Sequence, residues 1–146
     1  MARTDFELQD GETLFYEGTL NHIKGKLNVT EGTGYLTNQR LVRYEASLTL
    51  KALIGLLAKL FKQKFDFEIS LRDIQSIKPE QKGLYKKNAF YLTKTDGTEM
   101  RLVSFKRDDL MSAFRQAYDH HTDLSLSELS HQEWFVQGAG SHAAAD

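Results

Sequence analysis

The sequence predicts a mainly β fold with one α-helix: about seven antiparallel strands form a barrel that a C-terminal helix closes. Short strand-like runs recur from residue 13 to residue 105, and turn signals such as Asp96-Gly97 separate them. A single amphipathic segment, residues 107–121, follows these runs. The chain has 146 residues, of which 40% are hydrophobic and 27% charged, and this is enough for one domain with one core.

The strands are expected in a fixed order along the chain. Turns at residues 10–12 and 24–26 bound the first strand, and the only proline, Pro79, ends the fifth strand or marks a sheet edge. The expected strands are residues 13–22, 27–29 leading into 32–37, 39–46, 65–71, 75–78, 88–95 and 98–105.

A tight hairpin is expected at residues 32–46. Its turn is Asn38-Gln39, and Asn tolerates the positive φ that a two-residue turn demands. Such a turn sets Leu36 opposite Leu41 and Tyr35 opposite Val42, so both faces of the hairpin carry apolar groups. We therefore expect one face to line the barrel and another segment to cover the second face.

The clearest strand is residues 65–71, where apolar and polar residues alternate strictly. In the helix at residues 107–121, apolar residues recur at spacings of three and four, and Asp108 and Asp109 occupy the first turn, where the helix dipole favours negative charge. The residues that we expect in the core of these two segments are Phe65, Phe67, Ile69, Leu110, Phe114 and Tyr118.

Residues 122–146 are expected to form a C-terminal extension. Ser125 to Glu128 has the pattern of a capping box, which predicts a short helix that ends at Gly138. Residues 138–146 have the composition of a disordered end. We expect the short helix to dock on the domain or on a neighbour through Leu126, Leu129, Trp134 and Phe135.

The segment GTGYLTNQRLV, residues 32–42, resembles the hairpin signature of GRAM domains, in the form found in bacterial proteins. GRAM domains are a branch of the pleckstrin-homology (PH)-like superfold. Residues comparable to those of GRAM domains occur in the same order along the chain, before the hairpin at 11–12 and after it at 67–74, 95–97 and 107–108. The resemblance therefore covers about residues 8–121 as one domain. It implies a PH-like barrel that acts as a non-catalytic binding module, often at membranes, and it names no ligand.

An insertion at residues 50–64 does not belong to a minimal barrel. On a helical wheel Lys51, Lys59 and Lys62 share one arc with Gly55 and Gln63, and large apolar side chains fill the remaining broad arc. Its longest uncharged run, residues 52–58, is far shorter than the ~20 residues that span a bilayer. The residues expected to make its contacts are Leu53, Ile54, Leu57, Leu60, Phe61, Lys51, Lys59 and Lys62.

Three interpretations of this inserted amphipathic helix remain open. It can fold back over its own sheet with the lysines in solvent, lie on a membrane surface, or meet a second copy across a two-fold axis. An uncovered apolar face of this size would be unusual for a monomer, so one of the three must cover it.

Two lysine-bearing loops and one arginine are candidate anion-binding groups. PH-like domains that bind phosphoinositides usually hold the phosphates near the loop between their first two strands, where this chain has Lys24 and Lys26. A second loop could add attraction to anionic lipid, worth about 1 kcal/mol per basic residue. Arg40 matches the hairpin arginine of the family and either stabilises the sheet locally or contacts a ligand. The second loop carries Lys82, Lys86 and Lys87.

Several functions are not expected from this sequence. A net charge of -1 argues against a nucleic-acid partner, and the absence of cysteine excludes disulfides and thiolate chemistry. His120 and His121 point about 100° apart on a helix, so they cannot easily share a metal ion. No arrangement typical of catalysis is visible, so we expect no enzymatic activity, no metal and no cofactor.

The leading hypothesis is a PH/GRAM-like binding module that acts on an anionic membrane surface or on a protein partner. The N-terminus lacks the apolar run of a signal peptide, which favours a cytoplasmic protein, peripheral at the inner membrane face. The main alternative is a self-assembling structural protein, a homo-oligomer whose inserted helix forms the interface. The superfold alone does not decide between these hypotheses.

Overall fold

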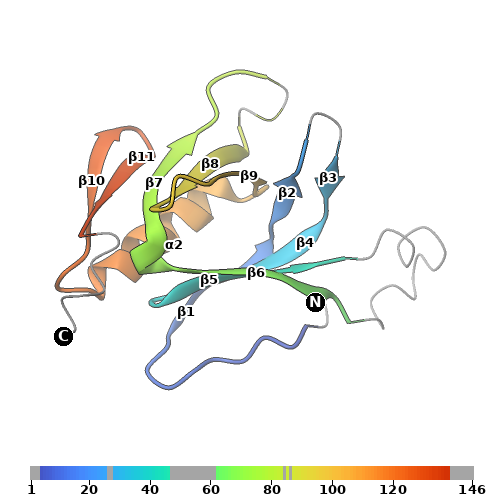
Figure 1. Ribbon diagram of the computed structural model, residues 1–146, viewed down its shortest axis with the longest axis horizontal. Coiled ribbons are helices and arrows are strands. Elements are labelled where there is room, and N and C mark those ends of the chain that lie inside the picture. Colours follow the sequence, from blue (N-terminus) through green and yellow to red (C-terminus); the bar gives the residue numbers. More distant parts are fainter. Residues whose placement is uncertain (1–3, 26–27, 47–61, 84, 86, 139–146) are drawn as a thin grey trace.

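The computed structural model describes residues 4–25, 28–46, 62–83, 85 and 87–138. In these residues two antiparallel sheets enclose a core, and one α-helix packs against it (Figure 1). The elements are β1 (Leu14–Thr19), β2 (Asn21–Ile23), β3 (Val29–Thr30), β4 (Gly32–Thr37), β5 (Arg40–Glu45), β6 (Lys64–Ser70), the 3₁₀-helix η2 (Leu71–Asp73), β7 (Ile74–Pro79), β8 (Ala89–Lys94), β9 (Glu99–Val103), α2 (Arg107–Asp119), β10 (Ser125–Ser130) and β11 (Glu133–Gln137).

The mainly β fold closed by a helix is confirmed. One sheet has the strand order β1-β4-β5-β6 and the other β10-β11-β7-β8-β9-β2-β3. The described residues thus form eleven strands rather than about seven, for two reasons. The first two expected strands each bend at a corner and contribute to both sheets, and a C-terminal hairpin adds two more strands.

The corner between β1 and β2 requires close approach of two backbones. The amide of Leu20 donates to the carbonyl of Gly32, with 3.0 Å between nitrogen and oxygen. A Cβ atom on Gly34 would lie 2.7 Å from the Leu20 side chain, and one on Gly32 would lie 2.2 Å from a backbone oxygen of Tyr44. Glycine at both positions therefore allows the two sheets to meet.

Helix α2 places its apolar face on the core between the sheets. Leu110, Phe114 and Tyr118 are fully or almost fully buried, as expected, together with Ile69 of β6. The hydroxyl of Tyr118 donates to the Leu71 carbonyl across 2.8 Å, and burial raises the pKa of this phenol. These contacts anchor the helix to the connection between the sheets.

The β4–β5 hairpin has the expected register, with Tyr35 opposite Val42 and Leu36 opposite Leu41. The expected positive φ at Asn38 is wrong, because Gln132 is the one described non-glycine residue with positive φ. Instead, the Asn38 side chain binds the N-terminal turn, accepting from the amide of Thr13 and donating to the carbonyl of Gly11. Asparagine thus joins two turns here.

The second face of this hairpin is covered by the N-terminal segment. The ring of Phe6 stacks on Tyr35, with 4.1 Å between ring centroids, and Phe6 and Leu14 pack on a small cluster that includes Val42 and Tyr44. The side chain of Asp5 pairs with Lys62 across 2.9 Å. Residues 47–61, which hold most of the expected inserted helix, lie outside the described residues.

The placement of Phe65 in the core is wrong. Arg43 faces Phe67 and Tyr44 faces Phe65, so Asp66 is an extra residue that forms a β-bulge in β6. The bulge reverses the alternation, and Phe65 therefore lies on the outer face against Tyr44, with 60% of its surface exposed. Phe67 stays on the inner face, where it is partly buried against the core.

The short helix expected after residue 125 is also wrong. Residues 125–137 form the hairpin β10–β11, and β11 pairs with β7, so this segment extends the larger sheet. Trp134 is buried and Leu126 packs on the core, whereas Leu129 and Phe135 are exposed. In β11 inward and outward residues alternate, with Trp134 and Val136 inward. The capping-box pattern before this strand favoured a helix instead.

Replacing Phe114 by Ala should lower the free energy of unfolding by about 3–5 kcal/mol, because the ring is fully buried and would leave a cavity. Phe65→Ala is the matched control and should cost less than about 1 kcal/mol, since that ring is mostly in solvent. Urea unfolding of the two variants measures both values. Equal costs would contradict the positions assigned to α2 and β6.

Candidate functional site

The two lysine-bearing loops leave the larger sheet at opposite ends of its strands, because β2 and β8 run in the same direction beside β9, and the β7–β8 loop precedes β8 whereas the β2–β3 turn follows β2. The turn between β2 and β3 begins with Lys24, and the loop between β7 and β8 carries Lys82 and Lys87. Strand β9 links them, because Arg101 lies opposite Ile23 of β2 and stands over the Tyr85 ring of the loop.

Arg101 fixes the β7–β8 loop to the sheet. Its guanidinium carbon lies 5.8 Å from the ring centroid of Tyr85 and 6.0 Å from that of Tyr91, and its terminal nitrogen pairs with Glu80. Glu80 also accepts from the Tyr91 hydroxyl across 3.2 Å. Burial, Glu80 and Glu99 raise the pKa of Tyr91, and the phenol therefore remains a hydrogen-bond donor at neutral pH.

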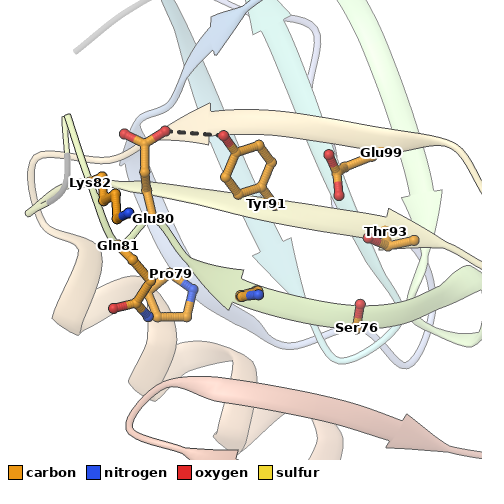
Figure 2. Close-up of a pocket in the computed structure, with 9 residues that line it drawn as sticks. Ser76, Pro79, Glu80, Gln81, Lys82, Tyr91, Thr93 and Glu99 are labelled. Carbon is orange, nitrogen blue, oxygen red and sulfur yellow. Dashed lines mark hydrogen bonds between the residues drawn. The ribbon is translucent and has the colours of Figure 1, made fainter. Parts of the chain in front are cut away.

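A cavity of about 550 Å³ lies next to this loop, on the outer face of β7, β8 and β9 (Figure 2). Its floor is the outward row of the sheet, because the neighbouring residues Ile77 and Leu92 point into the core. The walls combine hydroxyl, carboxylate and ammonium groups: Ser76, Lys78, Glu80, Lys82, Tyr91, Thr93 and Glu99.

The polar cluster under the β2–β3 turn centres on Arg43, which has no exposed surface. Its guanidinium donates to the carbonyl of Leu20 across 2.7 Å and to that of Thr30 across 2.6 Å. It also pairs with Asp66 and, across 3.1 Å, with Glu45. The bulge in β6 turns Asp66 inward, so the buried charge is neutralised.

Lys24 belongs to the same cluster. Its ammonium group lies 2.9 Å from Glu45 and 3.6 Å from Asp66. Burial raises the pKa of Glu45, but hydrogen bonds from Lys24, Thr30 and Arg43 outweigh it and lower this pKa to about 2. The positive charge of Lys24 is thus largely balanced by carboxylates of its own domain.

His22 faces this cluster from β2. Its Nδ1 atom lies 3.6 Å from an Asp66 oxygen, and its ring stands edge-on to Phe67. Burial and the positive charge of Arg43 lower the pKa of His22, although Asp66 opposes them. The imidazole is therefore neutral at pH 7.

Arg40 lies at the other end of β5 and is engaged in structural contacts. Its guanidinium donates to Glu12 and to Glu68, each across 2.8 Å, and to the carbonyl of Glu7. It also stands over the Phe6 ring. Burial raises the pKa of Glu12, but the hydrogen bonds from Arg40 and Thr37 outweigh it and lower this pKa. These contacts support the structural interpretation of Arg40 over ligand contact.

The remaining expected site residues are only partly described. Lys62 is exposed and pairs with Asp5, while Lys26 and Lys86 lie outside the described residues. The same holds for the other candidate interface residues, Lys51, Leu53, Ile54, Leu57, Lys59, Leu60 and Phe61. Lys82 lines the cavity and Lys87 is exposed.

The two adjacent histidines diverge in the structure. His120 stands edge-on to Phe15, whereas Nε2 of His121 bonds the carbonyl oxygen of Asn38. Among the described residues no three His, Cys, Asp or Glu side chains gather as a metal site would require. In the same part of the chain, no helix is long and apolar enough to cross a bilayer.

Sequence reasoning missed Arg43, Asp66, Glu80 and Arg101. For Arg43 a signal existed, since it is two residues after Leu41 and must share its inward face. The sequence around Asp66 gave no such signal, because the strict alternation of residues 65–71 predicts an outward side chain at position 66. Glu80 and Arg101 are separated by 21 residues, and only the pairing of β8 with β9 brings them together.

Comparison with known proteins identifies the fold. No known sequence family matches the chain, and no curated protein matches it. Similar solved structures include the C-terminal domain of an unknown protein from Leishmania infantum, with a TM-score of 0.54 and 19% identity over 73% of this chain and 84% of that one.

Two further similar structures contain DH/PH domains. The linker-DH/PH fragment of p115-RhoGEF has a TM-score of 0.53 and 13% identity over 77% of this chain. Human ARHGEF11, solved with human RhoA and its inhibitor, has a TM-score of 0.54 and 17% identity over 75% of this chain. The chain spans 30% of each of these two chains. These similarities support a PH-like fold, and the GRAM resemblance stays a prediction.

Glu45→Gln should lower stability at neutral pH by about 2 kcal/mol, a value reduced for its partial exposure. The carboxylate has a pKa of about 2 when folded and about 4.5 when unfolded, so its contribution is complete above pH 4.5 and disappears as the pH falls towards 2. Urea unfolding of both proteins across this range measures the difference. Glu17→Gln, an exposed carboxylate on β1, controls for the lost charge, and a pH-independent difference for Glu45→Gln would contradict the network.

Proposed function

We propose that this protein is a non-catalytic PH-like binding module that docks on anionic membrane surfaces through the β7–β8 loop next to Arg101. The observation that carries this proposal is the exposure of Lys82 and Lys87 on this loop, which Arg101 holds against the sheet through Tyr85 and Glu80. Adjacent positive charges of this kind attract an anionic bilayer.

Lys24 of the β2–β3 turn contributes less to anion binding than the lysines of the β7–β8 loop. Lys24 is paired with Glu45 and Asp66, so its attraction for an external anion is reduced. Lys82 and Lys87 are exposed, and among the described residues no ion pair engages them. Each such lysine adds about 1 kcal/mol at an anionic surface, and this attraction weakens as salt increases.

A protein partner is the second candidate, and a different surface supports it. Leu129 and Phe135 on the β10–β11 hairpin are exposed by 68% and 42%, and within the described part of the chain β10 has no neighbouring strand on its outer edge. Exposed apolar groups beside a free sheet edge are typical of contacts with another chain. Related folds have been solved in complexes with RhoA, which is a property of those proteins.

Charge reversal in the β7–β8 loop should weaken binding to anionic vesicles. We expect Lys82→Glu and Lys87→Glu each to reduce the partition coefficient about tenfold, because each removes one attraction of about 1 kcal/mol and adds a repulsion. Co-sedimentation with phosphatidylglycerol vesicles measures the change. Lys94→Glu is the control, since β8 carries Lys94 to its other end, and an equal loss in that variant would overturn the proposed surface.

The inserted segment tests the membrane hypothesis against self-assembly. If residues 50–64 form an apolar contact surface, Leu57→Glu should reduce either vesicle binding or the oligomeric mass by light scattering, while the barrel remains folded. A loss of vesicle binding alone favours the membrane, and a loss of mass alone favours the homo-oligomer. If the variant is folded and unchanged in both assays, this segment is neither anchor nor interface.

A further inference from the structure

We propose that the cavity on the outer face of β7, β8 and β9 binds a phosphodiester that carries a primary ammonium group, as in the headgroup of an ethanolamine phospholipid. The inference rests on the proposed function, because it names the lipid chemistry that this end of the molecule recognises. Lys82 belongs to both the cavity wall and the basic loop, so one docked orientation serves both.

Glu80 provides the main reason for an ammonium group. Its side chain is only 5% exposed, and its Oε1 atom receives the Tyr91 hydroxyl and pairs with Arg101. The Oε2 atom is buried and has no hydrogen-bond partner among the described residues. A buried carboxylate oxygen without a donor is costly, and a ligand ammonium supplies N–H groups together with the complementary charge.

The lysines of the cavity require the ligand to carry negative charge as well. Lys78 and Lys82 line the same cavity as Glu80, and they would repel a ligand that is only cationic. A phosphate group compensates both ammonium groups and accepts hydrogen bonds from hydroxyls such as those of Ser76 and Thr93. The combined chemistry therefore matches a zwitterion rather than a simple anion or cation.

The aromatic ring that lines the cavity argues for a primary ammonium and against choline. A quaternary ammonium is usually held on aromatic faces. Here the lining ring is that of Tyr91, and it already faces Arg101. In addition, a quaternary nitrogen has no N–H group to donate to Oε2 of Glu80. Ethanolamine esters should therefore bind more tightly than choline esters of the same phosphate.

Titration of the full chain with soluble headgroups tests this proposal without any variant. The probes are glycerophosphoethanolamine, glycerophosphocholine and glycerophosphoglycerol, followed by the backbone NMR signals of Ser76, Glu80 and Thr93. We expect the ethanolamine ester to bind about tenfold more tightly than the other two, the ratio expected for a hydrogen bond to a charged group. Equal affinities, or no shift at these three residues, would overturn the proposal.

Two matched variants test the role of Glu80. Glu80→Gln keeps a side-chain oxygen for Tyr91 and Arg101 but removes the charge, so the preference for ethanolamine over choline should disappear. Glu17→Gln, on the other sheet, should preserve it. If Glu80→Gln changes the fold, Glu99→Gln on the facing wall replaces it, with a smaller loss of preference expected. An unchanged preference in a folded Glu80→Gln would contradict the assignment.

Vesicles identify the source of the ligand. Phosphatidylcholine vesicles with phosphatidylethanolamine should bind more protein than phosphatidylcholine alone, and this gain should disappear in Glu80→Gln. Binding of the soluble ester without such a gain would support the same site for a soluble phosphodiester. If anionic vesicles recruit the protein but no ethanolamine preference exists, the further inference fails and the proposed function stands. If the ethanolamine preference exists but anionic vesicles do not recruit the protein, the result supports the cavity and overturns membrane docking through the β7–β8 loop.

Discussion

The buried charge of Arg43 is the constraint on which most of this fold depends. An arginine without exposed surface must find partners for its N–H groups and a counter-charge, because an uncompensated buried charge costs about 3–5 kcal/mol. The partners come from four elements: the corner between β1 and β2, strand β3, the end of β5 and the bulge of β6. Arg43 thus joins the two sheets where their strands bend.

This constraint explains several departures from a regular barrel. Asp66 can reach Arg43 only because an extra residue interrupts β6, and the same interruption moves Phe65 to the outer face. Gly32 lies against the guanidinium, where a Cβ atom would be 2.8 Å from one of its nitrogens. Arg43 thus accounts for the bulge, and it adds to the backbone contact with Tyr44 that already requires glycine at position 32.

The sequence was sufficient for the elements whose signals are local. The β4–β5 register, the core positions of Ile69 and Phe114, and the closing helix all follow from periodicity and turn residues. It was insufficient where tertiary contacts override the local pattern. The capping-box pattern of residues 125–128 did not show that β7 had a free edge, and pairing with that edge makes the segment a strand. Likewise, Arg101 meets Glu80 and Tyr85 of the β7–β8 loop only through the pairing of β7, β8 and β9.

The two lysine-bearing loops belong to two charge systems with different consequences. Around Arg43 every charge has a partner of opposite sign, so Lys24 contributes to folding more than to binding. Around Arg101 the balance is incomplete: one oxygen of Glu80 lacks a donor in the described structure, and the exposed Lys82 and Lys87 face solvent. The amino-acid composition does not distinguish these lysines, whereas their ion pairs do. An external ligand therefore binds most favourably next to the cavity, where the charges of the protein are incompletely balanced.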